Sequence, residues 1–282
     1  MRTRVLNPRY TLFAGLMLLL AATGVSNRAS AAPAADGPIV KQAYTAPGNI
    51  PVEVFSDPAS EHRPLMLVLA HGYNFSKINM VNIAEAVARA GYTAITFDFA
   101  GHGENPNDLD PSDPFPQTTA DLENVIEFAR QTLHGTQLAL LGHSMGANTV
   151  LPYAMKHPEF VATMGVSGNI TDFGAGLPRN LLLFVGTSED EGVIEDYQNA
   201  MQSAQAPAVL PYQFVEGTAR LGVMIPGATH TTILYSAQTA QTVVDWLNAA
   251  LRGSTLQIQN EGKAACWLDL AVNSIRLVSI CA

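Results

Sequence analysis

Short, largely apolar runs separated by helical patterns constrain the fold of this chain more than any other feature. The runs occupy residues 65–70, 92–97, 137–141 and 181–185. A continuous apolar run of this length is typical of a strand that is buried on both faces. Between the runs, apolar residues recur at helical spacing, as they do from Met80 to Val87. Strands that alternate with helices predict an α/β fold, with a mostly parallel, doubly wound sheet flanked by helices.

The alternation predicts one α/β domain over residues 49–252. A length of 282 residues suits one large domain, and 48% hydrophobic residues suit a buried core. Residues 32–48 are rich in Ala, Pro and Gly, and we expect them to form a leader into that domain. Residues 253–282 do not follow the alternation, so they are assigned only as a C-terminal tail. In an exported protein, Cys266 and Cys281 of this tail could pair.

Residues 1–31 have the pattern of a secretory signal peptide. Three arginines and no acid precede the apolar run Leu12–Val25, and small residues follow it around Ala31. The run is shorter than the roughly 20 residues that a membrane-spanning helix needs. We therefore expect an exported protein, periplasmic or secreted. The alternative is an uncleaved segment that anchors the domain to a membrane, the one case in which we expect a membrane partner.

The net charge excludes one class of partner. The formal charge of the whole chain is −9, and removal of residues 1–31 takes away four arginines and no acids, which leaves −13. A strongly acidic surface repels phosphate backbones, so we expect no nucleic-acid partner.

The pentapeptide Gly142-His143-Ser144-Met145-Gly146 indicates a nucleophile. It directly follows a predicted buried strand and opens a predicted helix, which is the strand–turn–helix setting of a nucleophile elbow. Such a turn strains the backbone of Ser144 and leaves no room for side chains at positions 142 and 146. The alternative is a glycine-rich turn without catalysis.

His230 is predicted as the general base by exclusion. In nucleophile-elbow enzymes the triad residues follow one another in the order Ser, acid, His. Only His157 and His230 follow Ser144, and His157 lies at the far end of the helix that Ser144 begins. His230 lies between the last predicted strand and the last helix, on the same edge of the sheet as Ser144.

The acid is predicted in the loop after the strand at 181–185. Glu189, Asp190 and Glu191 compete there. Glu191 lies three residues after Ser188, the spacing of a capping box. Asp190 suits the first turn of a helix, where acids are commonly structural. We therefore choose Glu189 and keep Asp190 as the alternative.

Acyl transfer needs two N–H donors for the oxyanion. The backbone of Met145, which follows the nucleophile, is one candidate. The other is the backbone of Tyr73, in the loop after the strand at 65–70. Asp98 and His102 are predicted to belong to a structural loop, with His102 near the pocket.

Five segments taken in order resemble one known family. They are LVLAHGY, FDFAGHGENP, LLGHSMGAN, NLLLFVGTSE and PGATH. Together they resemble α/β-hydrolases of the dienelactone-hydrolase and monoacylglycerol-lipase-like groups, over about residues 50–252. The resemblance implies Ser144 as nucleophile, His230 as base and Glu189, three residues past the strand-ending glycine, as acid. It also implies that a lid, if present, would follow the strand near Val166. Residues 167–180 suffice only for a bare crossover, so we expect a minimal lid or none.

The expected function is carboxylic-ester hydrolysis through an acyl-enzyme on Ser144, with a small-molecule or extended acyl substrate and no metal or organic cofactor. An amidase, a peptidase or an acyltransferase would use the same residues. A non-catalytic binding protein that kept the fold is the alternative from another class.

Overall fold

The computed structural model describes residues 38–59, 63–173, 176–204, 211–256, 271–272 and 275–276. The predicted signal peptide and both cysteines lie outside these residues. Within them, no helix has both the length and the apolar character needed to cross a bilayer.

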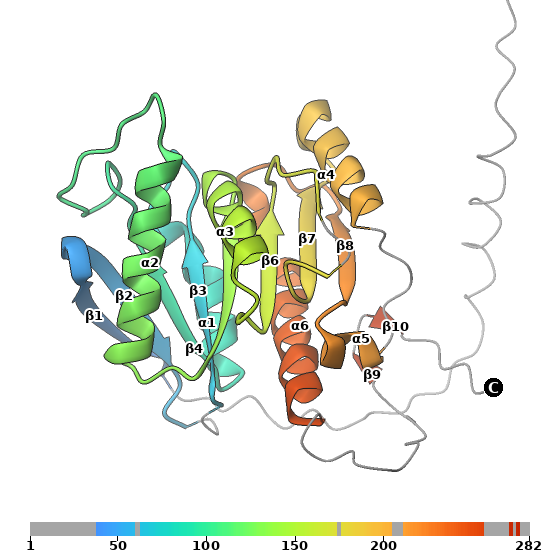
Figure 1. Cartoon of the computed structure of the whole chain (residues 1–282), viewed down its shortest axis with the longest axis horizontal. Helices are drawn as coiled ribbons and strands as arrows, with labels where there is room; N and C mark the ends of the chain where they lie inside the picture. The colour runs from blue at the N-terminus through green and yellow to red at the C-terminus, as the bar shows by residue number, and fades with distance from the viewer. Residues whose placement is uncertain are drawn as a thin grey trace, which may run out of the picture. The chain divides into compact units, whose positions relative to one another are not determined.

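An eight-stranded sheet forms the centre of the domain (Figure 1). Its spatial order is β1-β2-β4-β3-β5-β6-β7-β8. The strands are β1 (Val40–Ala46), β2 (Ile50–Ser56), β3 (Leu65–Ala70), β4 (Thr93–Phe97), β5 (Gln137–His143), β6 (Ala162–Val166), β7 (Leu181–Gly186) and β8 (Arg220–Ile225). Strands β3 to β8 pair in parallel, and β2 pairs antiparallel with both β1 and β4. The predicted mostly parallel sheet is confirmed.

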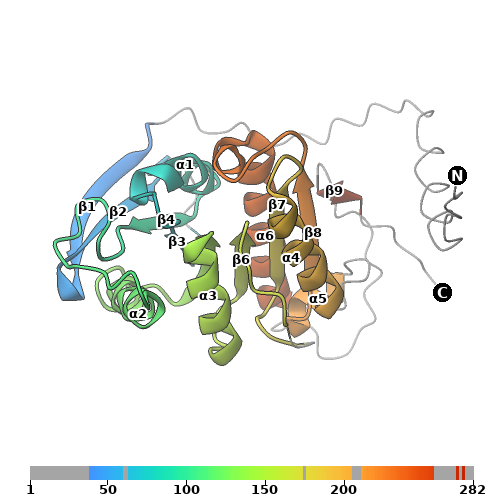
Figure 2. The same ribbon diagram turned by 90° about the horizontal axis from the view of Figure 1, so that it is seen from above.

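Helices cover both faces of this sheet, as the view onto its carboxyl edge shows (Figure 2). One face carries α1 (Val81–Arg89) and α6 (Ala237–Leu256). The other carries α2 (Phe115–Gln131), α3 (Met145–Lys156) and α4 (Glu191–Ser203). The short helix α5 (Pro211–Glu216) packs on α6, where the rings of Phe214 and Trp246 lie 4.7 Å apart. The sheet is therefore doubly wound, as predicted.

Alternate side chains of each central strand enter two separate cores. In β3, Leu65, Leu67 and Leu69 pack in the core beneath α1 and α6. Met66, Val68 and Ala70 of the same strand pack in the core beneath α2 and α3. This is why the strand has no polar position: both of its faces are covered.

Three regions refine the prediction. Strand β1 lies inside the predicted leader 32–48, so the sheet begins before residue 49. Helix α6 continues to Leu256, past the predicted domain end at residue 252. Two further short strands, β9 (Ala271–Val272) and β10 (Ile275–Arg276), pair with each other in the predicted tail.

The crossover from β6 to β7 is short. Its described residues, 167–173 and 176–180, contain no helix or strand. The minimal or absent lid predicted at this position agrees with that arrangement.

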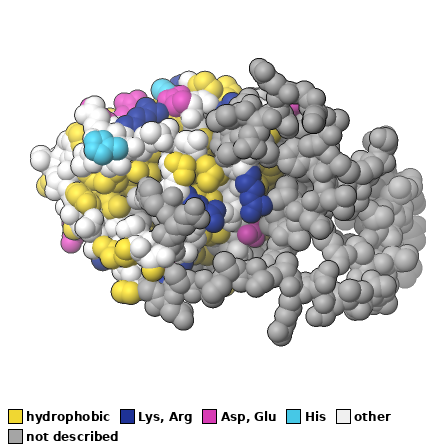
Figure 3. Space-filling view, turned by 90° about the horizontal axis from the view of Figure 1, so that it is seen from below, with side chains coloured by type: hydrophobic (Ala, Val, Ile, Leu, Met, Phe, Trp, Pro, Cys, Tyr) yellow, Lys and Arg dark blue, Asp and Glu magenta, His cyan; other side chains and the backbone are white. Residues whose placement is uncertain are grey.

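The two edges of the sheet carry different segments of the chain. The amino edge, seen from below, shows groups of hydrophobic side chains, with a few Lys and Arg side chains near its centre (Figure 3). The carboxyl edge carries the segments that follow β3, β4, β5, β7 and β8. All of the predicted site residues lie in these segments.

Candidate active site

Ser144 occupies a sharp turn between β5 and α3. Its backbone has φ 52° and ψ −115°, in the left-handed half of φ that a residue with a side chain rarely adopts. Its N–H donates to the carbonyl of Val166 on the neighbouring strand, at 2.9 Å. A Cβ added to Gly142 would lie 2.2 Å from the carbonyl oxygen of Gly146. One added to Gly146 would lie 2.3 Å from that of Ala70. The predicted elbow geometry is present, and both glycines are required for it.

His230 and Glu189 are hydrogen-bonded to each other near this turn, where the ring of His143, the residue before Ser144, lies 4.8 Å from the ring of His230. The Nδ1 atom of His230 lies 2.8 Å from Oε2 of Glu189. The other carboxylate oxygen, Oε1, accepts a hydrogen bond from the Ser167 hydroxyl. The Glu189 side chain is 0% exposed and that of His230 is 43% exposed. A buried carboxylate thus orients an imidazole that remains accessible, with Nδ1 as the protonated nitrogen and Nε2 as the free one.

Asp190, the alternative acid, has a different position. It is the N-cap of α4, and its carbonyl accepts the N–H of Val193 at 3.0 Å and that of Ile194 at 3.2 Å. The helix therefore begins at Glu191, and Ser188 is not its cap, contrary to the predicted capping box. Of the two candidate acids, the structure pairs Glu189 with His230.

The loops after β7 and β8 are joined by their backbones. The N–H of Ser188 donates to the carbonyl of Ala228 at 2.9 Å, and the N–H of Gly227 donates to the Thr187 hydroxyl at 2.7 Å. A Cβ on Gly186 would lie 2.1 Å from the Ala228 oxygen. These contacts, rather than the ion pair alone, place the carboxylate next to the imidazole.

The pair shifts both pKa values. Burial raises the pKa of the Glu189 carboxyl, but hydrogen bonds from His230 and Ser167 outweigh it and the net shift is downward. The hydrogen bond to Glu189 raises the pKa of His230 above 6.5, although burial opposes the rise. Both shifts favour the ionised pair, which is the state that forms when His230 accepts a proton.

The loop after β3 carries Tyr73, the second of the two predicted oxyanion donors. A Cβ on Gly72 would lie 3.1 Å from that of Ser144, so this loop passes directly beside the nucleophile. Among the described residues, the N–H of Tyr73 has no acceptor. Met145 is the first residue of α3, where a backbone N–H has no partner within the helix. Both predicted donors thus lack an acceptor among the described residues and remain candidates for the oxyanion site.

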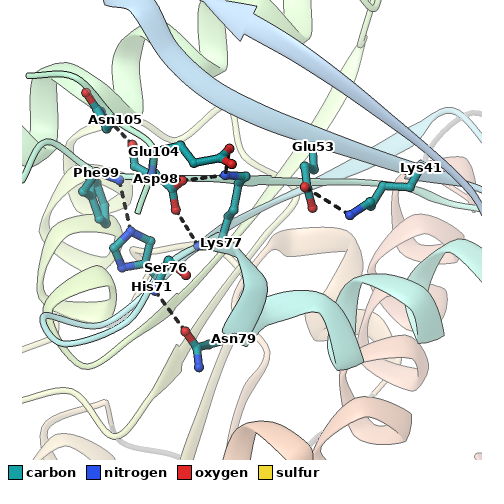
Figure 4. A network of polar contacts seen from close by, with 10 residues as sticks. All are labelled: Lys41, Glu53, His71, Ser76, Lys77, Asn79, Asp98, Phe99, Glu104 and Asn105. Atoms are coloured by element: carbon teal, nitrogen blue, oxygen red, sulfur yellow. Dashed lines mark hydrogen bonds and ion pairs between the residues drawn. The ribbon is translucent and has the colours of Figure 1, made fainter. Parts of the chain in front are cut away.

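An ionic network fixes this loop from behind, with Lys77 and Asp98 buried and Glu104 exposed at its outer end (Figure 4). Lys77 Nζ lies 2.6 Å from Asp98 Oδ2 and 2.7 Å from Glu104 Oε2. Asp98 also accepts the backbone N–H groups of Lys77 at 2.7 Å and Glu104 at 2.9 Å. The Lys77 side chain is 4% exposed and that of Asp98 is 0% exposed. The network ties the segment after β3 to the segment after β4.

His71 makes a second connection between the same segments. Its Nδ1 donates to the carbonyl of Gly72 at 2.8 Å, and its Nε2 accepts the N–H of Phe99 at 3.0 Å. Burial lowers the pKa of His71 to about 4, so the ring is neutral at ordinary pH. The ring of His102 lies 5.4 Å from that of Tyr73, edge to face. Asp98 is structural, as predicted, and His102 lies against the predicted oxyanion loop.

Sequence reasoning did not identify Lys77 or Ser167. Each is a common polar residue whose importance depends on a partner 21 or 22 positions away. A lysine inside a segment between two buried strands was the available signal for Lys77, but it does not reveal burial.

Known proteins resemble the chain in sequence and in structure. Residues 61–188 match the family described as serine aminopeptidase, S33. The sn-1-specific diacylglycerol lipase of Xenopus tropicalis is 35% identical over 96 residues, which cover 34% of this chain and 28% of the relative. A thermostable monoacylglycerol lipase of Bacillus sp. (strain H-257) is 27% identical over 111 residues, which cover 39% of this chain and 43% of the relative. The chain therefore spans less than half the length of these relatives.

Among solved structures, one from Xanthomonas campestris is described as an α/β serine hydrolase without lid. It superposes with a TM-score of 0.52 at 17% identity, covering 78% of this chain and 94% of that chain. At this level of identity the likeness concerns the fold.

The Lys77 network generates a stability prediction. Lys77→Met should lower the free energy of unfolding by about 3–5 kcal/mol, because it leaves Asp98 as a buried charge without its cation. Lys41→Met is the matched control, since the Lys41–Glu53 pair has a half-exposed lysine (54%) and should cost less than about 1 kcal/mol. Urea unfolding of both variants measures the difference. Equal losses would mean that the network does not depend on burial.

The Glu189–His230 pair generates a titration prediction. NMR titration of the His230 ring should give a midpoint above 6.5 in the unaltered protein and a lower midpoint in Glu189→Gln, which removes the stabilising anion. The contribution of the raised His230 pKa to stability should be lost as pH rises through the folded value of His230. The contribution of the lowered Glu189 pKa should be lost as pH falls through the folded value of Glu189, so the pair stabilises the protein most between the two. Identical midpoints in the two proteins would contradict the ion pair.

Proposed function

We propose that the chain is a member of the α/β-hydrolase superfamily, and that it is a serine hydrolase that cleaves carboxylic esters. The observation that carries the proposal is the Glu189–His230 pair, with Nδ1 and Oε2 at 2.8 Å, beside a serine in strained elbow geometry. A buried carboxylate, an accessible imidazole and a serine at the start of a helix are the components that acyl transfer requires.

In the proposed reaction, the Ser144 hydroxyl attacks the acyl carbon of the ester. His230 Nε2 accepts the hydroxyl proton, and Glu189 stabilises the imidazolium that results. The oxyanion of the tetrahedral intermediate accepts hydrogen bonds from the N–H groups of Tyr73 and Met145. His230 then protonates the leaving alcohol, and water activated by the same His230 releases the acid from the acyl-enzyme.

The Ser144 hydroxyl has no hydrogen-bond partner among the described residues. Catalytic hydrogen bonds are often long without substrate and shorten in the reactive complex. The proposal therefore places the Ser144–His230 hydrogen bond in the substrate complex.

The relatives support esters as the substrate class. Two of them are named as lipases of diacylglycerol and monoacylglycerol, and both substrates are carboxylic esters. The short crossover between β6 and β7 supports an acyl group that can be bulky or extended, because its described residues include no helix that could cover Ser144. The family description of residues 61–188 keeps amide hydrolysis as the competing activity.

The proposal also includes the site of action. The arrangement of residues 1–31 supports export to the periplasm or the medium, and an uncleaved segment would instead keep the domain at a membrane.

A fluorophosphonate probe tests the nucleophile. The folded protein should become labelled with one probe per chain, and Ser144→Ala should not be labelled, because the probe reacts with an activated serine hydroxyl. Intact-mass spectrometry measures the adduct, and peptide mapping locates it. A protein that is folded by circular dichroism but unlabelled would favour a non-catalytic binding protein instead.

Unlabelled protein from the same preparation distinguishes ester from amide cleavage. Turnover of p-nitrophenyl esters of increasing acyl length, compared with the matching anilides, gives the preferred bond. Added alcohol reports acyl transfer through the ester that it forms.

The two neighbouring acids provide a matched pair of variants. Glu189→Gln should lower kcat by about 10⁴-fold, because an amide does not hold the imidazole in its reactive tautomer. Asp190→Asn should change kcat by less than about threefold, since its backbone caps α4 and its carboxylate is not paired with His230. Steady-state kinetics on the best p-nitrophenyl ester measures both. A larger loss in Asp190→Asn would reassign the acid.

A further inference from the structure

His143 lies where three loops of the candidate site meet. It is the last residue of β5, directly before Ser144, and it is 0% exposed. Its ring stacks on Phe75 of the loop after β3, with centroids 5.2 Å apart and planes at 22°. The ring of His230, from the loop after β8, lies 4.8 Å away on a tilted plane.

Among the described residues, the ring of His143 has one polar contact, and that contact is with the proposed base. Its Nε2 lies 2.8 Å from the backbone carbonyl oxygen of His230. A carbonyl only accepts, so Nε2 carries the proton and donates it. Its Nδ1 is buried and has no hydrogen-bond partner among the described residues. The ring is thus the neutral tautomer, with its single N–H directed at the main chain of His230.

The surroundings favour this neutral state. Burial lowers the pKa of His143 to about 4. A charge here would lie next to the ring that becomes positive when His230 accepts the Ser144 proton, and like charges at this distance disfavour each other. The neutral His143 ring can hold the main chain of His230 by a hydrogen bond without opposing the protonation of the His230 ring.

The His143 ring also lies close to the backbone of Gly72, on the side of its Nδ1 atom. A Cβ added to Gly72 would lie 2.7 Å from His143 Nδ1. Gly72 directly precedes Tyr73, the proposed oxyanion donor. One imidazole therefore contacts both the loop that carries the base and the loop that carries the oxyanion donor.

We propose that His143 is a positioning residue, which sets the His230 loop and the oxyanion loop relative to Ser144 through its Nε2–H bond and its ring contacts. The inference rests on the proposed function, because it assigns His143 a part in the chemistry of that site. It acts through the main chain of His230 and touches neither the substrate nor the transferred proton.

Two substitutions separate the hydrogen bond from the packing. His143→Phe keeps a ring against Phe75 but has no donor. His143→Gln supplies an amide N–H that can reach the His230 carbonyl. We expect His143→Phe to lower kcat by about 10–100-fold with KM within about threefold, the cost of a small displacement of the catalytic groups. We expect His143→Gln to recover most of that loss.

His157→Phe is the matched control for the loss of a histidine. His157 also stacks on an aromatic ring, that of Tyr153 at 4.0 Å, but it lies at the far end of α3. The kcat of the His157→Phe variant should equal that of the unaltered enzyme. If His143→Phe does not fold, His143→Asn replaces it, because its shorter amide cannot span to the carbonyl.

The measurements distinguish a failure of the proposed serine-hydrolase function from a failure of the positioning role of His143. No fluorophosphonate label on Ser144 of the unaltered protein would refute the proposed function. Full activity in His143→Phe, or equal losses in folded His143→Phe and His143→Gln, would refute the positioning role alone. NMR titration of the His230 ring is independent of activity: its midpoint should shift in His143→Phe and return toward the original value in His143→Gln. An unshifted midpoint in His143→Phe would also overturn the positioning role.

Discussion

The candidate site depends on the close approach of the α3 backbone at Gly146 to the β3 backbone at Ala70. The first turn of α3 lies so close to the end of β3 that no side chain fits between Gly146 and the carbonyl of Ala70. This approach fixes where α3 begins, and therefore where Ser144 stands above the sheet. The loop after β3 passes the same point, so Ser144, the proposed nucleophile, and the proposed oxyanion donors are positioned by one close backbone contact. Preorganised donors of this kind require no rearrangement when charge develops on the substrate.

Buried polar groups behind the site also fix the position of the loop after β3, through hydrogen bonds and an ion pair. Lys77 and Asp98 form an ion pair away from water, and His71 links the same two segments as a neutral ring. Burying charge is costly, and an apolar replacement of similar shape is often no less stable. What the polar groups supply here is direction: their hydrogen bonds fix the start of the short 3-10 helix Lys77–Met80 against the irregular segment that follows β4.

Much of this was predictable from the sequence, for identifiable reasons. Strand β3 was placed to the residue because a strand with both faces covered leaves a continuous apolar run in the sequence. Ser144 and His230 followed from motif context and chain order. Strand β1 was missed because its exposed, polar positions resemble a leader. The choice between Glu189 and Asp190 rested on helix-start rules. Ser167 and Lys77 act through tertiary contacts, and those contacts leave no trace in the neighbouring sequence.

The plain crossover between β6 and β7 has a consequence for the timing of turnover. In enzymes whose active site is closed by a mobile segment, the opening of that segment often limits the overall rate. If the proposed hydrolysis takes place, no helix in the described part of this crossover has to move before reactants arrive or products depart. The rate of turnover would then depend little on the motion of this segment, and solvent viscosity would test that dependence.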